Sequence, residues 1–122
     1  QLILSASNNK PLANLAQEAC YEELLACGVE ISLYRPHFLH AKHMSVDEEI
    51  ALVGSLNLDI RSFALNAEIG LICYDQRVVA RMREIEAEYL ADAKHLSLEQ
   101  WQARPRFKRS LEGIARLADS FL

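Results

Sequence analysis

Short apolar segments that fit strands alternate along the chain with segments whose apolar residues recur at helical spacing. Leu2–Ala6 predicts a short buried strand, and the helix after it has Pro11 in its first turn and Gly28 just beyond its end. Four further strands are predicted at Val29–Tyr34, His40–Val46, Ile50–Val53 and Ala67–Cys73. This alternation predicts an α/β fold, a layered sheet flanked by helices.

A long helix is predicted after Asp75, whose side chain suits a helix cap. Its apolar face combines Val78, Val79, Met82, Ile85, Tyr89 and Leu90. The acidic residues between them, Glu84, Glu86 and Glu88, are expected on the solvated face. Because the pattern shows neither an internal repeat nor a linker, we expect a single domain over residues 1–122, with an amphipathic tail over residues 98–122.

Composition narrows the class of protein. Hydrophobic residues make up 51% of the 122 and charged residues 25%, which is typical of a folded domain. The net charge of −4 disfavours a nucleic-acid partner, because phosphate backbones attract basic surfaces. Apolar runs such as Ile50–Val53 are too short to cross a bilayer. Since the chain starts at Gln1 and Leu2-Ile3-Leu4 already fits a strand, we expect an excerpt of a longer protein.

The motif His40-x-Lys42 carries the first chemical signal. Residues two apart in a strand face the same side of the sheet, so the imidazole and the ammonium are expected to project together. A lysine neutralises the anionic oxygens of a phosphodiester, while a histidine attacks phosphorus or protonates the leaving oxygen. The pair therefore indicates phosphoryl-transfer chemistry.

Polar residues recur where the next strand ends, at Gly54-Ser55-x-Asn57. The returning strand would bring them beside the histidine and lysine, and Gly54 permits a close backbone approach. Ser55 and Asn57 would stand at a helix N-terminus, which attracts anions. Asp47 falls at the turn between the strands, where it either orients neighbouring groups or hydrogen-bonds its own backbone.

Glu68 interrupts the apolar run Ala67–Cys73. A carboxylate in a buried strand costs free energy unless it is paired. His40 is the expected partner, because a hydrogen bond to one ring nitrogen would determine which nitrogen reacts. We therefore include Glu68 in the candidate site.

These residues resemble the HKD signature of the phospholipase D superfamily in type and spacing. The matching positions are His40-x-Lys42, Asp47 and Gly54-Ser55-x-Asn57. The continuation is similar to that of bacterial cardiolipin synthases, with Asn57-Leu58-Asp59-x-Arg61-Ser62-Phe63 and Asn66-x-Glu68. The resemblance extends over nearly the whole chain and predicts a phospholipase D-like domain, specifically the C-terminal one of two HKD halves.

What the resemblance implies is a reaction without metal or other cofactor. Members place two HKD motifs across one pocket, where one histidine becomes a phosphohistidine and the other serves as general acid and then base. His40, in the second motif, would be the acid and base, with the opposite assignment left open. Lys42 and Asn57 would hold phosphoryl oxygens, Glu68 would orient His40, and Ser55 would support the hydrogen-bond network.

Three histidines close in sequence, His37, His40 and His43, superficially suggest a metal site. Lys42 lies among them and would repel a cation, and strand geometry would separate the three rings. We expect no metal ligands here, and place His37 and His43 at the flank of the site.

The resemblance also implies partners. The substrate would be a phospholipid, phosphatidylglycerol, and the longer protein would supply the N-terminal HKD half and contact the bacterial inner membrane, while this fragment would be soluble. With one motif, the isolated chain is expected to be inactive unless a weak homodimer restores two. A hydrolytic phospholipase D, an HKD nuclease and a module that only folds and pairs remain alternatives.

Overall fold

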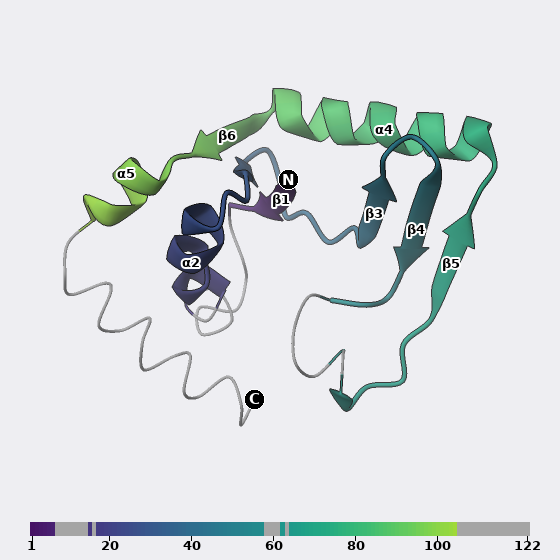
Figure 1. The fold of residues 1–122 in the computed structure, drawn as a ribbon, viewed down its shortest axis with the longest axis horizontal. Helices are drawn as coiled ribbons and strands as arrows, with labels where there is room; N and C mark the ends of the chain where they lie inside the picture. The colour runs from purple at the N-terminus through teal and green to yellow at the C-terminus, as the bar shows by residue number, and fades with distance from the viewer. Residues whose placement is uncertain (7–14, 16, 58–61, 63, 105–122) are drawn as a thin grey trace. The chain divides into compact units, whose positions relative to one another are not determined.

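A computed structural model describes residues 1–6, 15, 17–57, 62 and 64–104, and its ribbon is shown in Figure 1. The chain divides into two compact units, residues 1–39 with 90–122 and residues 40–89. Within the described residues each unit contains one three-stranded sheet together with helix, so the expected α/β fold is confirmed. The predicted helix start at Pro11 and the tail beyond residue 104 lie outside the described residues, and the single-domain expectation stays a prediction.

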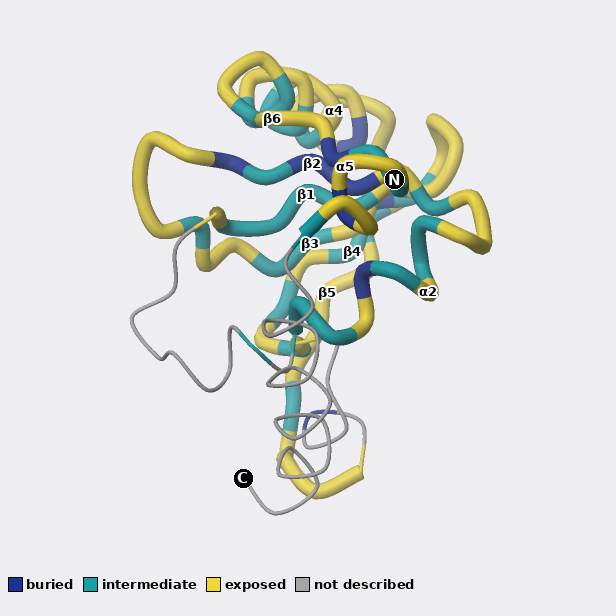
Figure 2. Tube along the Cα trace, turned by 90° about the vertical axis from the view of Figure 1, so that its left-hand side faces the viewer, coloured by how far each residue is buried: buried dark blue, intermediate teal, exposed yellow. Residues whose placement is uncertain are grey.

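In the first unit, β2 (Ile31–Tyr34) is the central strand of the sheet. It pairs in parallel with β1 (Leu2–Ser5) and antiparallel with β6 (Ala93–Leu96). Two short helices, α2 (Tyr21–Ala26) and α5 (Leu98–Gln102), belong to the same unit. Figure 2 shows the buried part of β2 in dark blue. The core of the unit combines Tyr21, Ile31, Leu96 and Trp101.

Two aromatic rings connect the helices of this unit, since the rings of Tyr21 and Trp101 lie 5.0 Å apart. The α5 helix begins where Ser97 Oγ accepts a hydrogen bond from the backbone of Gln100 at 3.1 Å. Beyond α2, Gly28 takes a φ of 85°, which glycine adopts without strain and which ends the helix as expected. The segment 98–102 is therefore a helix that packs Trp101 into this core, and the amphipathic tail expected over residues 98–122 stays a prediction.

The second unit contains an antiparallel meander of β3 (His43–Val46), β4 (Ile50–Gly54) and β5 (Gly70–Cys73). The long helix α4 (Gln76–Ala91) starts in this unit. Asp75 caps it as predicted, because its carboxylate accepts from Arg77 N at 2.9 Å. None of the described helices is long and apolar enough to cross a membrane.

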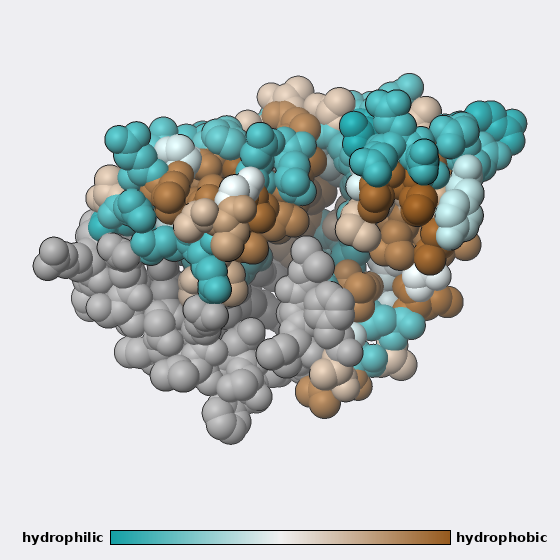
Figure 3. Space-filling model, viewed as in Figure 1, coloured by the Kyte–Doolittle hydropathy of each residue, from teal (hydrophilic) through white to brown (hydrophobic). Residues whose placement is uncertain are grey.

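Three predicted strands begin later than expected, β2 by two residues and β3 and β5 by three. β3 starts at His43 rather than His40, so His40 and Lys42 lie in the segment that leads into the strand. β5 starts at Gly70 rather than Ala67, and it is exposed rather than buried: Leu71 is 66% exposed and Ile72 is 52% exposed. Leu71 and Ile72 are adjacent and face opposite sides of the sheet, so within the described residues neither side of this strand is covered. Figure 3 shows brown apolar side chains along this sheet, beneath the teal surface of α4.

The acidic residues of α4 do not behave alike. The side chains of Glu84 and Glu88 are each 65% exposed and pair with Arg81, as the solvated-face prediction implies. The prediction is wrong for Glu86, whose side chain is 18% exposed and lies against His43 and Ser45 of β3.

Candidate active site

The open end of the β3–β4 hairpin brings the predicted site segments together. Gly54 N donates to the Lys42 carbonyl at 3.0 Å, which places the residues before β3 beside the end of β4. Ser55 N donates to the Ile69 carbonyl at 2.9 Å, and Ile69 N donates to Ser55 Oγ at 3.0 Å. Segments around residues 42, 55 and 69 therefore meet at one end of this sheet.

Gly54 makes the close approach possible, as the sequence predicts. It lies opposite Gly70 in the register of β4 and β5. A Cβ added to Gly54 would collide with the carbonyl oxygen of Ile69 and stand 3.0 Å from Gly70 Cα. By contrast, a Cβ on Gly70 would meet nothing nearer than Leu52 Cδ1 at 4.0 Å.

The histidine and lysine of the predicted motif lie in contact. Lys42 Nζ is 3.2 Å from each ring nitrogen of His40 and donates to the His40 carbonyl at 3.0 Å. The Lys42 ammonium can only donate hydrogen bonds, so a ring nitrogen of His40 that carries no proton accepts from it. The lysine thereby places a positive charge next to the imidazole. His40 is exposed and Lys42 is half-buried, which leaves the imidazole accessible to a substrate.

Glu68 lies just before β5 and is half-buried. One carboxylate oxygen accepts a short hydrogen bond from Ser55 Oγ, and the other accepts from Asn66 Nδ2 at 3.4 Å. The hydrogen bond from Ser55 lowers the pKa of the Glu68 carboxyl most, followed by that from Ser62, and Asn66 and the positive charge of Lys42 lower it further. Glu68 is thus held as a carboxylate. Its predicted role in orienting His40 stays a proposal.

Ser62 hydrogen-bonds two of the predicted site residues, Asn57 and Glu68, although no role is predicted for it from the sequence. Its Oγ accepts from Asn57 N at 3.2 Å, its side chain also bonds Glu68, and the residue is only 4% exposed. The only available signal was its position in the motif that follows Asn57. Asn57 is exposed, and the helix predicted to begin at Ser55 and Asn57 would continue through residues 58–61, which lie outside the described residues.

Asp47 lies in the turn between β3 and β4, with a φ of 52°. The register runs from His43 opposite Val53 to Val46 opposite Ile50, so this turn is at the other end of the hairpin from Lys42 and Gly54. Aspartate is one of the few residues that adopt positive φ readily. The structure therefore brings Asp47 to the turn and not to the cluster formed by the other site residues.

The neighbouring histidines have other partners. His37 stacks edge-on with Tyr34, with ring centroids 5.1 Å apart, and its ring is 3.3 Å from the Tyr34 hydroxyl. His43 pairs with Glu86. Within the described parts of the chain, no three His, Cys, Asp or Glu side chains come together as metal ligands.

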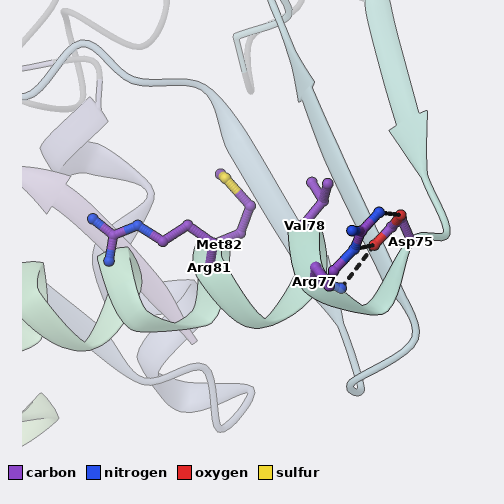
Figure 4. Close-up of a pocket in the computed structure, with 5 residues that line it drawn as sticks. All are labelled: Asp75, Arg77, Val78, Arg81 and Met82. Carbon is purple, nitrogen blue, oxygen red and sulfur yellow. Dashed lines mark hydrogen bonds and ion pairs between the residues drawn. The ribbon is translucent and has the colours of Figure 1, made fainter.

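A surface hollow at the start of α4 lies outside this cluster (Figure 4). It is lined by Asp75, Arg77, Val78, Arg81 and Met82. The guanidinium of Arg77 folds back onto the Asp75 carboxylate at 2.9 Å, and Arg81 donates to Glu84 at 2.9 Å. Both cations are already paired with carboxylates, and none of the predicted site residues lines the hollow.

Known proteins similar to this chain are cardiolipin synthases. The chain is 38% identical to cardiolipin synthase A of Cronobacter sakazakii, 37% to that of Pectobacterium atrosepticum and 34% to that of Proteus mirabilis. Each comparison covers 113 residues, 93% of this chain but 23% of the relative. The chain therefore spans about a quarter of the length of these relatives. No solved structure matches it.

The family comparison agrees with the geometry. The family described as "Cardiolipin synthase, PLD-like domain" matches residues 1–89, which include every residue of the candidate site. Together with the α/β fold and the paired imidazole and ammonium, this shows that the chain belongs to the phospholipase D-like domain family of the cardiolipin synthases.

Proposed function

We propose that this chain is the C-terminal catalytic half of a cardiolipin synthase, which moves a phosphatidyl group between two phosphatidylglycerol molecules. The observation that supports it most is the contact between Lys42 Nζ and the His40 ring at 3.2 Å, in a chain of this family. Since the chain spans 23% of its relatives, the proposal includes a second HKD half in a longer protein.

In the first step, a histidine of the other half attacks the phosphorus of phosphatidylglycerol. A phosphorus–nitrogen bond forms and the bond from phosphorus to the glycerol oxygen breaks, giving a phosphohistidine intermediate. His40 donates a proton to the leaving oxygen, so that neutral glycerol departs.

In the second step, a hydroxyl of another phosphatidylglycerol attacks the same phosphorus. His40 now removes the hydroxyl proton, the phosphorus–nitrogen bond breaks, and cardiolipin forms. His40 thereby returns to its starting protonation state. Transfer to water instead of lipid would give the hydrolytic alternative, so exclusion of water from the pocket decides between the two.

The other residues of the cluster would support the phosphoryl group and the imidazole. Lys42 and the Asn57 amide would hold phosphoryl oxygens, because an ammonium and an amide are the donors that developing negative charge requires. Glu68 would orient His40, and Ser55 would position the Glu68 carboxylate to which it donates. For Asp47 we propose a turn-forming role.

The proposal is tested with the full-length protein that carries this chain and vesicles of phosphatidylglycerol. We expect cardiolipin and glycerol in equal amounts, measured by mass spectrometry and an enzymatic glycerol assay. A parallel incubation with phosphatidylcholine and another with DNA measure the hydrolytic and nuclease alternatives. Cleavage of DNA with phosphatidylglycerol unchanged would overturn the lipid assignment.

The proposed setting is the inner membrane of a bacterium, reached through the longer protein. For the isolated chain we expect no turnover, because one HKD motif supplies one of the two histidines that the reaction needs. Turnover by the isolated chain would require a homodimer, so light scattering of an active sample decides whether two copies complete the pocket.

A further inference from the structure

A second polar cluster lies between β3 and α4. Glu86 Oε1 is 3.4 Å from His43 Nε2, and Ser45 Oγ donates to Glu86 Oε2 at 2.7 Å. The side chains of His43 and Glu86 are 12% and 18% exposed. Hydrogen bonds to a charged group that is mostly removed from water are stronger than those at the surface.

The geometry of this cluster follows from the strand. His43 and Ser45 are two residues apart in β3 and therefore face the same side, opposite Val53 and Ala51 in the register. Ala51 is fully buried and Val53 is 39% exposed, so this face is covered at Ser45 and opens toward the end of β4. The Glu86 carboxylate contacts His43 with one oxygen and Ser45 with the other. It thereby links two successive positions on this face of β3 to α4.

This link between β3 and α4 lies directly beside the candidate site. His43 follows Lys42 in the chain, and the Lys42 carbonyl accepts from Gly54 N at 3.0 Å, next to the first rung of the β3–β4 ladder. The backbone of Lys42 is therefore held by a hairpin that the Glu86 contacts link to α4. From that backbone, Lys42 Nζ reaches the His40 ring at 3.2 Å.

We propose that Glu86 and His43 are positioning residues for the phosphoryl transfer. By anchoring β3 at His43 and Ser45, the Glu86 carboxylate holds Lys42 where its ammonium meets both the imidazole and a phosphoryl oxygen. The inference rests on the proposed function and deepens it. It assigns a role in the reaction to a helix residue outside the HKD motif.

The test compares Glu86→Ala with Glu88→Ala in the full-length protein. Glu88 is on the same helix, and its side chain is 65% exposed and pairs with Arg81, so its removal leaves β3 untouched. We expect Glu86→Ala to lower kcat about tenfold with KM within about twofold, because a small misplacement of a charged group costs transition-state stabilisation. Glu88→Ala should keep the wild-type kcat.

Rescue separates positioning from a loss of negative charge. Glu86→Gln keeps an oxygen for Ser45 and an amide for the His43 ring, so it should retain at least about half of kcat. His43→Ala should lower kcat as much as Glu86→Ala does. The double variant should lose no more kcat than either single variant, since both changes break the same link between β3 and α4. Losses that multiply in the double variant, or equal kcat in Glu86→Ala and Glu88→Ala, would overturn the inference.

Folding and function are kept apart in the same experiment. If circular dichroism shows that Glu86→Ala is unfolded, Ser45→Ala and His43→Asn take its place, and an unchanged kcat in both overturns the inference. A wild-type protein that cleaves another phosphodiester but leaves phosphatidylglycerol unchanged refutes the proposed function, and the same kcat comparison is then made on that phosphodiester. A wild-type protein with no phosphodiester cleavage at all refutes both.

Discussion

The ammonium of Lys42 lies 3.2 Å from both ring nitrogens of His40 and 3.0 Å from the His40 carbonyl oxygen. These contacts hold the Lys42 side chain over the imidazole ring of His40. A positive charge held there can stabilise a phosphoryl oxygen at the same place where the imidazole exchanges its proton.

Replacing Lys42 by methionine should therefore reduce cardiolipin formation by the full-length protein by about 100-fold or more, as the loss of a preorganised charge in a transition state does. Lys94→Met is the matched control, because Lys94 is an exposed residue of β6 in the other unit. The initial rates of both variants are compared by mass spectrometry. Equal rates for Lys42→Met and Lys94→Met would remove Lys42 from the mechanism.

Gly54→Ala should destabilise the protein by about 2 kcal/mol, because overpacking next to rigid backbone costs this order of free energy. The added Cβ would collide with the Ile69 carbonyl oxygen, whereas a Cβ on Gly70 has its nearest neighbour at 4.0 Å. Gly70→Ala is therefore the control and should unfold in urea close to wild type. A Gly54→Ala variant as stable as Gly70→Ala would contradict the close packing of β4 on the segment before β5.

Much of this arrangement follows from local sequence. The β3–β4 hairpin was predicted because two predicted strands flank Asp47-Glu48-Glu49, and the turn is found there. Strand geometry predicts that His40 and Lys42 project together, and their contact is found although both residues precede the strand, which starts at His43.

What the sequence did not reveal depends on contacts between distant residues. β6 was missed because Ala93–Leu96 is short, has two adjacent polar residues in place of a strand alternation, and is recognisable only by its pairing with β2, some sixty residues earlier. The exposure of β5 depends on which distant segments cover its two faces. Glu86 was assigned to solvent because acidic residues on a helix usually are solvated, and only the position of β3 shows otherwise.

Ser62→Ala should lower activity as well as stability. Its Oγ accepts from the part-buried Asn57 N and its side chain bonds Glu68, so the change removes both hydrogen bonds, at a cost of about 1 kcal/mol each. Ser32→Ala is the control, because Ser32 is also 4% exposed but lies in β2 of the other unit. We expect reduced turnover per folded molecule for Ser62→Ala alone. Equal specific activities would limit Ser62 to a role in folding.

The stability of the Glu68 network should depend on pH in acid. Hydrogen bonds, that from Ser55 first, lower the pKa of Glu68 from 4.5, so its carboxylate stabilises the folded state above about pH 4.5 and this contribution is lost as the pH falls through the lowered pKa. Glu68→Gln cannot titrate. The difference in melting temperature between wild type and Glu68→Gln should be largest above pH 5 and shrink at lower pH. A difference that grows on acidification would contradict the assignment.

The most direct test of the proposed mechanism is the rate of cardiolipin formation by His40→Asn in the full-length protein. His95→Asn, an exposed histidine of β6, is the control. We predict a loss of about 100-fold to 10,000-fold for His40→Asn, the usual effect of removing a general acid and base, and a wild-type rate for His95→Asn. A His40→Asn protein that forms cardiolipin at the wild-type rate would contradict the proposed role of this chain.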